Sequence, residues 1–255
     1  MTKKIVFFDV DGTLTDHETG RIPQSTELAV KQLLDRGVIV VAATGRPLAM
    51  CEELAQLGIR NLITANGALV TIEDETIHKV VMSQQVVNEV NEYSIKHNHA
   101  LSYYQRDLRM NGVRHDLVLK ALKETLHIEK YPRTFIEGDV HLMCLFADEV
   151  IERQYQSTFP KLTFKRWHPY ILNVLECDIN KALAIQTVLD YFHLTAHDAV
   201  AFGDGDNDIE MLEVVSVGVA MENGSERLKR KATVITRAAK DDGIAIALRE
   251  LRLVE

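Results

Sequence analysis

The segment Ile5-Val6-Phe7-Phe8-Asp9-Val10-Asp11-Gly12-Thr13-Leu14 decides how the rest of the chain is interpreted. Its apolar start predicts a buried strand, because a strand of a parallel sheet is covered on both faces and needs no polar alternation. Two carboxylates follow, and Gly12 then lets the backbone turn sharply. Ligands of open α/β sheets bind at the carboxyl ends of the strands, so these acids are expected to face a crevice there.

The residues that follow alternate helix and strand signals. Residues 23–36 have leucines near helical spacing, with Gly37 placed to end a helix. Residues 38–43 form a second apolar run, and Pro47 suits the first turn of a helix that would extend to Gly58. Strand, helix, strand and helix in this order predict a parallel sheet with right-handed crossovers.

The pattern changes after residue 82. Helices are expected at 83–97, at 115–127 and up to about 159, with short strands at 100–104, 108–111, 141–147, 162–167 and 171–176. The α/β rhythm returns with a helix at 180–193 and strands at 199–202 and 217–220. We therefore predict an α/β, Rossmann-like core with a parallel central sheet, built from residues 1–82 and 178–255, and an inserted α+β domain at 83–177.

Composition excludes several classes of protein. The chain has 255 residues, of which 46% are hydrophobic and 26% charged, as in an ordinary globular protein. Its 29 basic and 37 acidic residues give a formal net charge of −8, which disfavours binding to nucleic acid. No apolar run approaches the roughly 20 residues of a membrane helix, so no membrane association is expected. The start Met1-Thr2-Lys3-Lys4 does not resemble a secretory signal, and we expect a cytoplasmic protein.

A second acidic cluster lies in Gly203-Asp204-Gly205-Asp206-Asn207-Asp208, directly after the strand expected at 199–202. Several carboxylates packed beside another acidic pair repel one another unless a cation compensates them. An all-oxygen set of ligands suits Mg²⁺. The alternative for this segment alone is a solvated acidic loop.

Two other segments offer groups that bind phosphate. Thr44 and the Gly45 N–H stand just ahead of an expected helix start, where backbone N–H groups favour anions. Lys181 opens the helix expected at 180–193. Each signal is weak alone, because threonine also caps helices and an isolated lysine is usually a surface residue.

The order of acid pair, threonine, lysine and acidic loop resembles the haloacid dehalogenase superfamily of phosphohydrolases, over essentially the whole chain. The position of the insertion resembles subclass IIB. Further segments resemble the Cof-type branch, namely Asn66-Gly67-Ala68, 203–212, Gly218-Val219-Ala220-Met221 and Asp242-Gly243-Ile244-Ala245. Ala182 departs from that branch, which usually has glycine after the lysine.

The resemblance implies roles for individual residues. Asp9 would be the nucleophile that forms an aspartyl-phosphate, and Asp11 the general acid and base. Mg²⁺ would be held by the Asp9 carboxylate, the Asp11 backbone carbonyl and Asp204. The phosphate would be bound by the Val10 backbone N–H, Thr44, Gly45, Lys181 and Asn207. Asp208 would orient Lys181 or metal-bound water rather than bind the metal directly.

The residues that contact the substrate beyond its phosphate are less sharply indicated. Asn66 and Gly67 follow the third core strand and either meet the substrate or form a simple turn. The inserted domain would act as a cap, with Arg133, His168 and Tyr170 as candidate substrate contacts. Trp167 is expected to be a packed aromatic rather than a binding platform.

These observations favour a Mg²⁺-dependent phosphatase of small phosphorylated metabolites, with sugar phosphates, flavin mononucleotide and pyridoxal phosphate all as candidate substrates. One alternative is phosphotransfer as in the phosphomannomutases, which share an Asp-Val-Asp-Gly-Thr-Leu segment and a similarly inserted cap. Another is a non-catalytic sensor of a phosphorylated metabolite, although such a protein would be expected to have lost Asp9, Asp11 or Lys181. The sequence leaves the oligomeric state open.

Overall fold

The protein was analysed as a computed structural model, which describes residues 4–135 and 137–255. Residues 1–3, on which part of the prediction about a secretory signal rests, lie outside this range. The chain forms two compact units. The first contains residues 4–45, 51–78 and 180–255, and the second contains 46–50 and 79–179.

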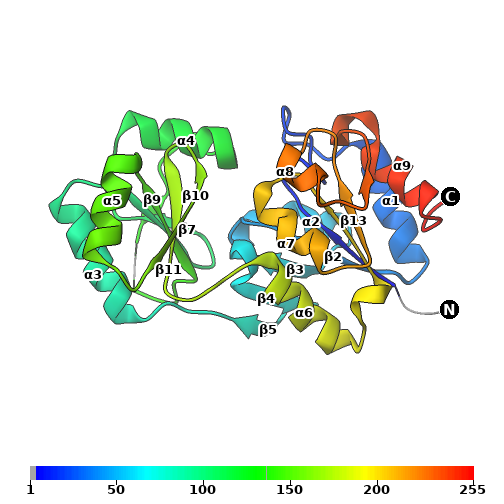
Figure 1. Cartoon of the computed structure of the whole chain (residues 1–255), viewed down its shortest axis with the longest axis horizontal. Helices are drawn as coiled ribbons and strands as arrows, with labels where there is room; N and C mark the ends of the chain where they lie inside the picture. The colour runs from blue at the N-terminus through cyan, green and yellow to red at the C-terminus, as the bar shows by residue number, and fades with distance from the viewer. Residues whose placement is uncertain (1–3, 136) are drawn as a thin grey trace. The chain divides into compact units, whose positions relative to one another are not determined.

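The first unit is built on an eight-stranded sheet (Figure 1). Its order is β14 (Val234–Ile235), β13 (Val217–Ala220), β12 (Ala199–Gly203), β1 (Ile5–Phe8), β2 (Ile39–Ala43), β3 (Asn61–Thr64), β4 (Leu69–Ile72) and β5 (Glu75–Lys79). The strands from β14 to β3 pair in parallel, which confirms the predicted parallel central sheet. β1 lies between β2 and β12, so Asp9 leaves the sheet at its centre.

Alternate residues of β1 pack into two hydrophobic cores, one on each face of this sheet. Val6 and Phe8 pack with residues of α1 (Gln24–Asp35), α2 (Glu52–Gln56) and α9 (Gly243–Glu250). Ile5 and Phe7 pack with residues of α6 (Lys181–Phe192) and α7 (Ile209–Glu213). Helices therefore cover both faces, and this accounts for the unbroken apolar run in the sequence.

The second unit contains a six-stranded sheet. Its order is β10 (Thr163–His168), β11 (Ile171–Leu175), β9 (Leu142–Phe146), β6 (Leu101–Tyr104), β7 (Leu108–Met110) and β8 (Arg133–Thr134). Apolar residues on one face pack with residues of α3 (Gln84–Lys96) and α5 (Glu149–Thr158), and α4 (Asp116–Leu126) completes the unit. The inserted domain was predicted at 83–177, and this unit contains residues 46–50 and 79–179.

The predicted helix from Pro47 to Gly58 is wrong. The chain instead forms a short 3₁₀ turn, Leu48–Met50, and then α2. Cys51, between these two elements, has φ of −117° and ψ of 14°, which is outside the α-helical region. The Ala49 N–H donates to the carbonyl of Arg106 at 2.8 Å, so this segment also contacts a part of the chain distant in sequence.

The sheet also departs from a wholly parallel arrangement. β3 and β4 pair antiparallel, with Leu62 opposite Thr71. A 3₁₀ turn, Ala65–Gly67, joins them, and Asn66 adopts a left-handed conformation with φ of 56°. The short strands β5, β8 and β14 and the short helix α8 (Glu226–Lys229) were not predicted either, because such elements give little hydrophobic periodicity.

The core between α1 and the sheet can be tested with two leucines of the same helix. Leu33 is fully buried and Leu28 is 55% exposed. We expect Leu33→Ala to lower the free energy of unfolding by about 2–5 kcal/mol, because it leaves a cavity. We expect Leu28→Ala to change it by less than about 1 kcal/mol. Urea denaturation of both variants measures the difference, and equal losses would contradict this packing.

Candidate active site

Three charged side chains, those of Asp9, Lys181 and Asp208, meet at the carboxyl ends of the central strands. Asp9 directly follows β1, and its N–H donates to the Phe202 carbonyl at 2.9 Å, which ties it to β12. Lys181 is the first residue of α6 and is fully buried. Its Nζ lies 2.5 Å from Asp9 Oδ1 and 2.6 Å from Asp208 Oδ1. The lysine therefore bridges two acids that are 199 positions apart in the sequence, as 208 − 9 gives.

The loop after β12 is folded around Asp208. The second carboxylate oxygen of Asp208 accepts the N–H groups of Asp204, at 3.0 Å, and of Gly205, at 2.9 Å. Both oxygens of Asp208 are thus engaged inside the protein, one by Lys181 and one by the loop backbone. The carboxylate orients the lysine and the loop together.

Asp204 has different partners. Its Oδ1 accepts the Thr13 hydroxyl at 2.9 Å, and its Oδ2 accepts the Asn223 amide at 3.3 Å. Asn223 also donates to the Gly12 carbonyl at 2.9 Å. Asn223 was not predicted as a site residue, because a lone asparagine in a loop carries no motif. No role was predicted for Thr13, although it is part of the acid motif that follows β1.

Gly12 is required by the close approach of the two loops. Its φ is +91°, a conformation that side chains rarely allow. A Cβ at this position would lie 2.3 Å from Asp204 Oδ2. The glycine of the acid motif therefore makes room for an acid that lies almost two hundred residues later.

The acids and the lysine shift one another's pKa values. Burial raises the pKa of Asp9 well above its usual range, and Asp208 adds to the rise while Lys181 opposes it. Burial and Asp208 likewise raise the pKa of Asp204 to about 6. Burial alone would lower the pKa of Lys181, but Asp208 and Asp9 outweigh it and raise that pKa above its ordinary value. The lysine is thereby kept charged.

One group of acids is suited to a metal ion. Oxygens of Asp9, Asp204 and Asp208 lie within 4.8 Å of one another, and this is the one such group found among residues 4–135 and 137–255. Three carboxylates face one ammonium, so the group retains excess negative charge when ionised. Hard oxygen ligands fit Mg²⁺. Lys181 contacts one oxygen of Asp9 and one of Asp208, whereas the oxygens of Asp204 accept from neutral donors, the Thr13 hydroxyl and the Asn223 amide.

Asp11 and Val10 accompany Asp9 on the loop after β1. Asp11 is partly exposed and pairs with Thr15 in an isolated bridge, and its charge contributes to the raised pKa of Asp9. The Val10 side chain is buried, and its carbonyl accepts the N–H of Thr15 at 2.9 Å. The loop is therefore held in a defined turn.

The remaining core residues predicted for the site form an adjoining group. Thr44 follows β2 and is fully buried, and its carbonyl accepts the Asn66 N–H at 3.1 Å. The Asn66 side chain accepts the Asn207 amide at 3.2 Å, and a Cβ on Gly45 would lie 3.2 Å from the same oxygen. The structure thus brings Thr44, Gly45, Asn66 and Asn207 together.

Gly67 has a structural reason to be glycine. Its φ is +106°, and a Cβ there would lie 2.4 Å from the carbonyl oxygen of Asn180. Asn180 is the N-cap of α6, with its side chain accepting the Leu183 N–H at 2.9 Å. The turn after β3 therefore packs directly against the start of the helix that carries Lys181.

The predicted contacts of the second unit do not form a single cluster. Arg133 is exposed on β8, at one edge of the six-stranded sheet, and His168 and Tyr170 lie at the opposite edge, where β10 turns into β11. His168 Nδ1 accepts the Tyr170 N–H at 3.2 Å, and its Nε2 lies 3.5 Å from Glu124. His168 is thus engaged within the turn, whereas the Tyr170 side chain is exposed.

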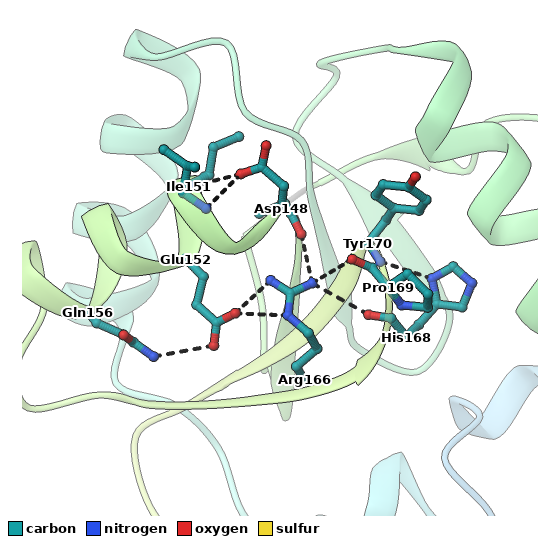
Figure 2. Close-up of polar contacts among 10 residues, drawn as sticks. Asp148, Ile151, Glu152, Gln156, Arg166, His168, Pro169 and Tyr170 are labelled. Atoms are coloured by element: carbon teal, nitrogen blue, oxygen red, sulfur yellow. Dashed lines mark hydrogen bonds and ion pairs between the residues drawn. The ribbon is translucent and has the colours of Figure 1, made fainter.

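Arg166, which sequence analysis also missed, fixes this turn (Figure 2). Its guanidinium donates two hydrogen bonds to Glu152, at 2.6 and 2.8 Å. It also donates to the carbonyls of Ala147 and Pro169, at 2.9 and 2.8 Å. One planar donor group therefore ties α5, the end of β9 and the turn together.

The fold and the acid–lysine cluster define a hydrolase of the haloacid dehalogenase type. The sequence profile of the haloacid dehalogenase-like hydrolases matches residues 6–248. YkrA of Bacillus subtilis, which carries a provisional name as a phosphatase, is 33% identical over the full length of both chains. The 5-amino-6-(5-phospho-D-ribitylamino)uracil phosphatase YcsE of the same organism is 29% identical, over 96% of this chain and 94% of YcsE.

Solved structures that resemble this chain support the same family. A hypothetical protein of Geobacillus kaustophilus HTA426 is 34% identical, with a TM-score of 0.90 over 99% of this chain and all of that one. The subclass IIB sugar phosphatase BT4131 is 30% identical, with a TM-score of 0.85 over the same shares. The chain belongs to the haloacid dehalogenase-like hydrolase family, and it is a phosphatase that acts on phosphorylated substrates.

Within the part of the chain that the structure describes, no helix is long and apolar enough to cross a membrane.

The bridging lysine gives a test of the site that does not depend on activity. We expect Lys181→Met, without metal, to lower the free energy of unfolding by roughly 3–5 kcal/mol near neutral pH, because two buried acids lose their cation. Lys31→Met, which removes an exposed pair with Asp35, should cost at most about 1 kcal/mol. Urea denaturation in EDTA measures both.

The same variant should change how stability depends on pH. Without Lys181 the pKa of Asp9 rises further, so the folded state binds a proton that the unfolded state has released. The contribution of Asp9 to the stability of the variant is then greatest below about pH 4, which is the pKa of the group in the unfolded chain. It falls as the pH rises toward the pKa of Asp9 in the folded state. We expect Lys181→Met to lose more stability than the wild type as the pH rises above the unfolded pKa of about 4. If the free energies of unfolding of the variant and the wild type change with pH in parallel, the bridge from Asp9 through Lys181 to Asp208 is contradicted.

Proposed function

We propose that the protein is a Mg²⁺-dependent phosphatase that hydrolyses small phosphorylated metabolites through an aspartyl-phosphate on Asp9. The observation that carries this proposal is the buried bridge from Asp9 through Lys181 to Asp208, with Asp204 beside it. A carboxylate that is oriented by a lysine and held at the carboxyl end of a central strand is suited to covalent phosphoryl transfer.

The charge of Lys181 favours the ionised form of Asp9, which nucleophilic attack requires. An Asp9 oxygen attacks phosphorus, and the bond from phosphorus to the leaving oxygen breaks. Asp11 protonates that oxygen, so the alcohol departs neutral. Water then attacks the aspartyl-phosphate, Asp11 takes a proton from the water, and inorganic phosphate leaves with Asp9 regenerated.

Mg²⁺ bound by the carboxylates of Asp9 and Asp204 and the backbone carbonyl of Asp11 would offset repulsion between the anionic nucleophile and the phosphate. Lys181, Thr44, Asn207 and the N–H groups of Val10 and Gly45 would stabilise the oxygens that are not transferred. Asp208 would position the lysine, because both of its own oxygens are engaged within the protein.

Recognition of the leaving group is assigned to the second unit, acting as a cap, with Arg133, His168 and Tyr170 as candidate contacts. Asn66 is a candidate contact from the core, and Gly67 supports it by close packing on Asn180. The names of the relatives, a sugar phosphatase and a phosphatase of a ribitylamino-uracil, support small phosphorylated metabolites as the substrate class.

The nucleophile can be tested against an acid in the neighbouring loop. We expect Asp9→Asn to reduce hydrolysis of an aryl phosphate by roughly 10³-fold or more, because the amide cannot form the intermediate. Asp206→Asn is the control, since Asp206 is half-exposed and pairs with Arg227 and Ser225. Release of inorganic phosphate measures both, and persistent turnover in Asp9→Asn would exclude Asp9 as the nucleophile.

The metal can be tested by thermal unfolding as well as by activity. We expect Mg²⁺ to raise the melting temperature of EDTA-treated wild type, because a ligand that binds the folded state alone stabilises it. Asp204→Asn should weaken that rise, and Asp206→Asn should retain it. A Mg²⁺-independent melting temperature together with full activity in EDTA would rule out the metal.

A further inference from the structure

The loop between β13 and α8, residues 221–225, lies against the acidic loop that follows β12. The Ser225 N–H donates to the backbone carbonyl of Asp204 at 3.0 Å. A Cβ on Gly224 would lie 3.0 Å from the same carbonyl oxygen and 3.1 Å from the Cα of Asp204. The 221–225 loop is therefore packed directly on the backbone of Asp204, within the first unit.

Asn223, in the middle of this loop, links two other segments through one nitrogen. Its Nδ2 donates to the Gly12 carbonyl at 2.9 Å and to Asp204 Oδ2 at 3.3 Å. Both partners can only accept, so the atom that faces them must be the amide nitrogen, which carries two hydrogens. Asn223 thus connects the turn after β1 to the Asp204 carboxylate.

The Asp204 carboxylate is held from two sides by neutral donors. The Thr13 hydroxyl donates to its Oδ1 at 2.9 Å, and the Asn223 amide donates to its Oδ2. Neutral donors orient the carboxylate without cancelling its charge. Each carboxylate oxygen has two lone pairs and therefore retains one for a further partner. Asp9 and Asp208 differ, because each has an oxygen on the Lys181 ammonium.

The Asn223 side chain is exposed, so its role is not to fill a hydrophobic core. Water could replace an exposed amide as the donor to Gly12 and Asp204, and the net contribution of such a hydrogen bond to stability is small. Water does not, however, hold a carboxylate in one orientation. The effect of Asn223 is therefore expected on the direction of the Asp204 carboxylate rather than on folding.

We propose that Asn223 is a positioning residue for the divalent cation. It holds the Asp204 carboxylate in the orientation in which Asp204 binds the ion, and it acts through Asp204 without contacting the ion or the substrate. The inference rests on the proposed function, which assigns Asp204 to Mg²⁺. Residues that orient metal ligands by hydrogen bonds typically change metal affinity by roughly 10- to 100-fold when they are replaced.

Metal binding is the direct test, and it needs no substrate. Asn223→Ala removes both donated hydrogen bonds, and Asn223→Leu removes them while nearly keeping the size of the side chain. We expect each variant to raise the Kd for Mg²⁺ by roughly 10- to 100-fold. Isothermal titration calorimetry of the full chain, treated with EDTA and then dialysed, measures this. Glu222→Gln, at the exposed neighbouring position of the same loop, is the control and should retain the wild-type Kd.

Two further measurements distinguish positioning from a merely structural role. In EDTA the melting temperature of both Asn223 variants should equal that of the wild type, because replacement of an exposed side chain has little effect on stability. In a Mg²⁺ titration of aryl phosphate hydrolysis, the concentration that gives half-maximal activity should rise by the same factor as the Kd. The kcat at saturating Mg²⁺ should stay near the wild-type value, since excess metal restores the bound state.

The outcomes separate the inference from the proposed function. If the wild type binds Mg²⁺ but hydrolyses no phosphate ester, the proposed function is wrong, and calorimetry of the Asn223 variants still decides the positioning role. If the wild type neither binds Mg²⁺ nor depends on it for activity, the proposed metal is wrong and the inference is wrong with it.

Other results would overturn the inference alone. The positioning role is wrong if folded Asn223→Ala and Asn223→Leu bind Mg²⁺ as tightly as the wild type. It is also wrong if they lose kcat at saturating Mg²⁺ while the half-activating concentration is unchanged. The proposed phosphatase mechanism stands in both cases.

Discussion

The burial of Lys181 between Asp9 and Asp208 is the constraint on which the first unit depends. A fully buried ammonium is tolerated only when anions compensate it, and two buried carboxylates tolerate each other only through the same cation. The bridge therefore fixes the end of β1, the start of α6 and the loop after β12 relative to one another. The arrangement of the charged cluster and the local stability of the unit rest on one set of contacts.

That arrangement explains several local features at once. The loop around Asp208 uses its own backbone N–H groups to hold the acid, so the acid cannot turn away from the lysine. Gly12 leaves room for Asp204, and Gly67 lets the turn after β3 reach the N-cap of α6. Each feature brings a different strand end to the same place, which is why the residues are so widely spaced in the sequence.

The sequence was most informative where one physical signal dominated. Buried apolar runs located β1, β2 and β12, and the order of acids, threonine and lysine located the charged cluster. The sequence was less informative at residues 47–58, where the helix signal did not show the interruption at Cys51. Asn223 and Arg166 were missed for a related reason, because their importance lies in partners that no local spacing indicates.

The central position of β1 also has a consequence for how the chain folds. β1 precedes the other strands of its sheet in chain order, yet one of its two neighbours, β12, is about 190 residues later. Until β12 arrives, the apolar strand Ile5–Phe8 has an unpaired edge, which is a template for aggregation. The long loop that must close before this pairing forms makes the step slow. The part of the protein that gathers its charged residues is thus completed only after β12 has been made.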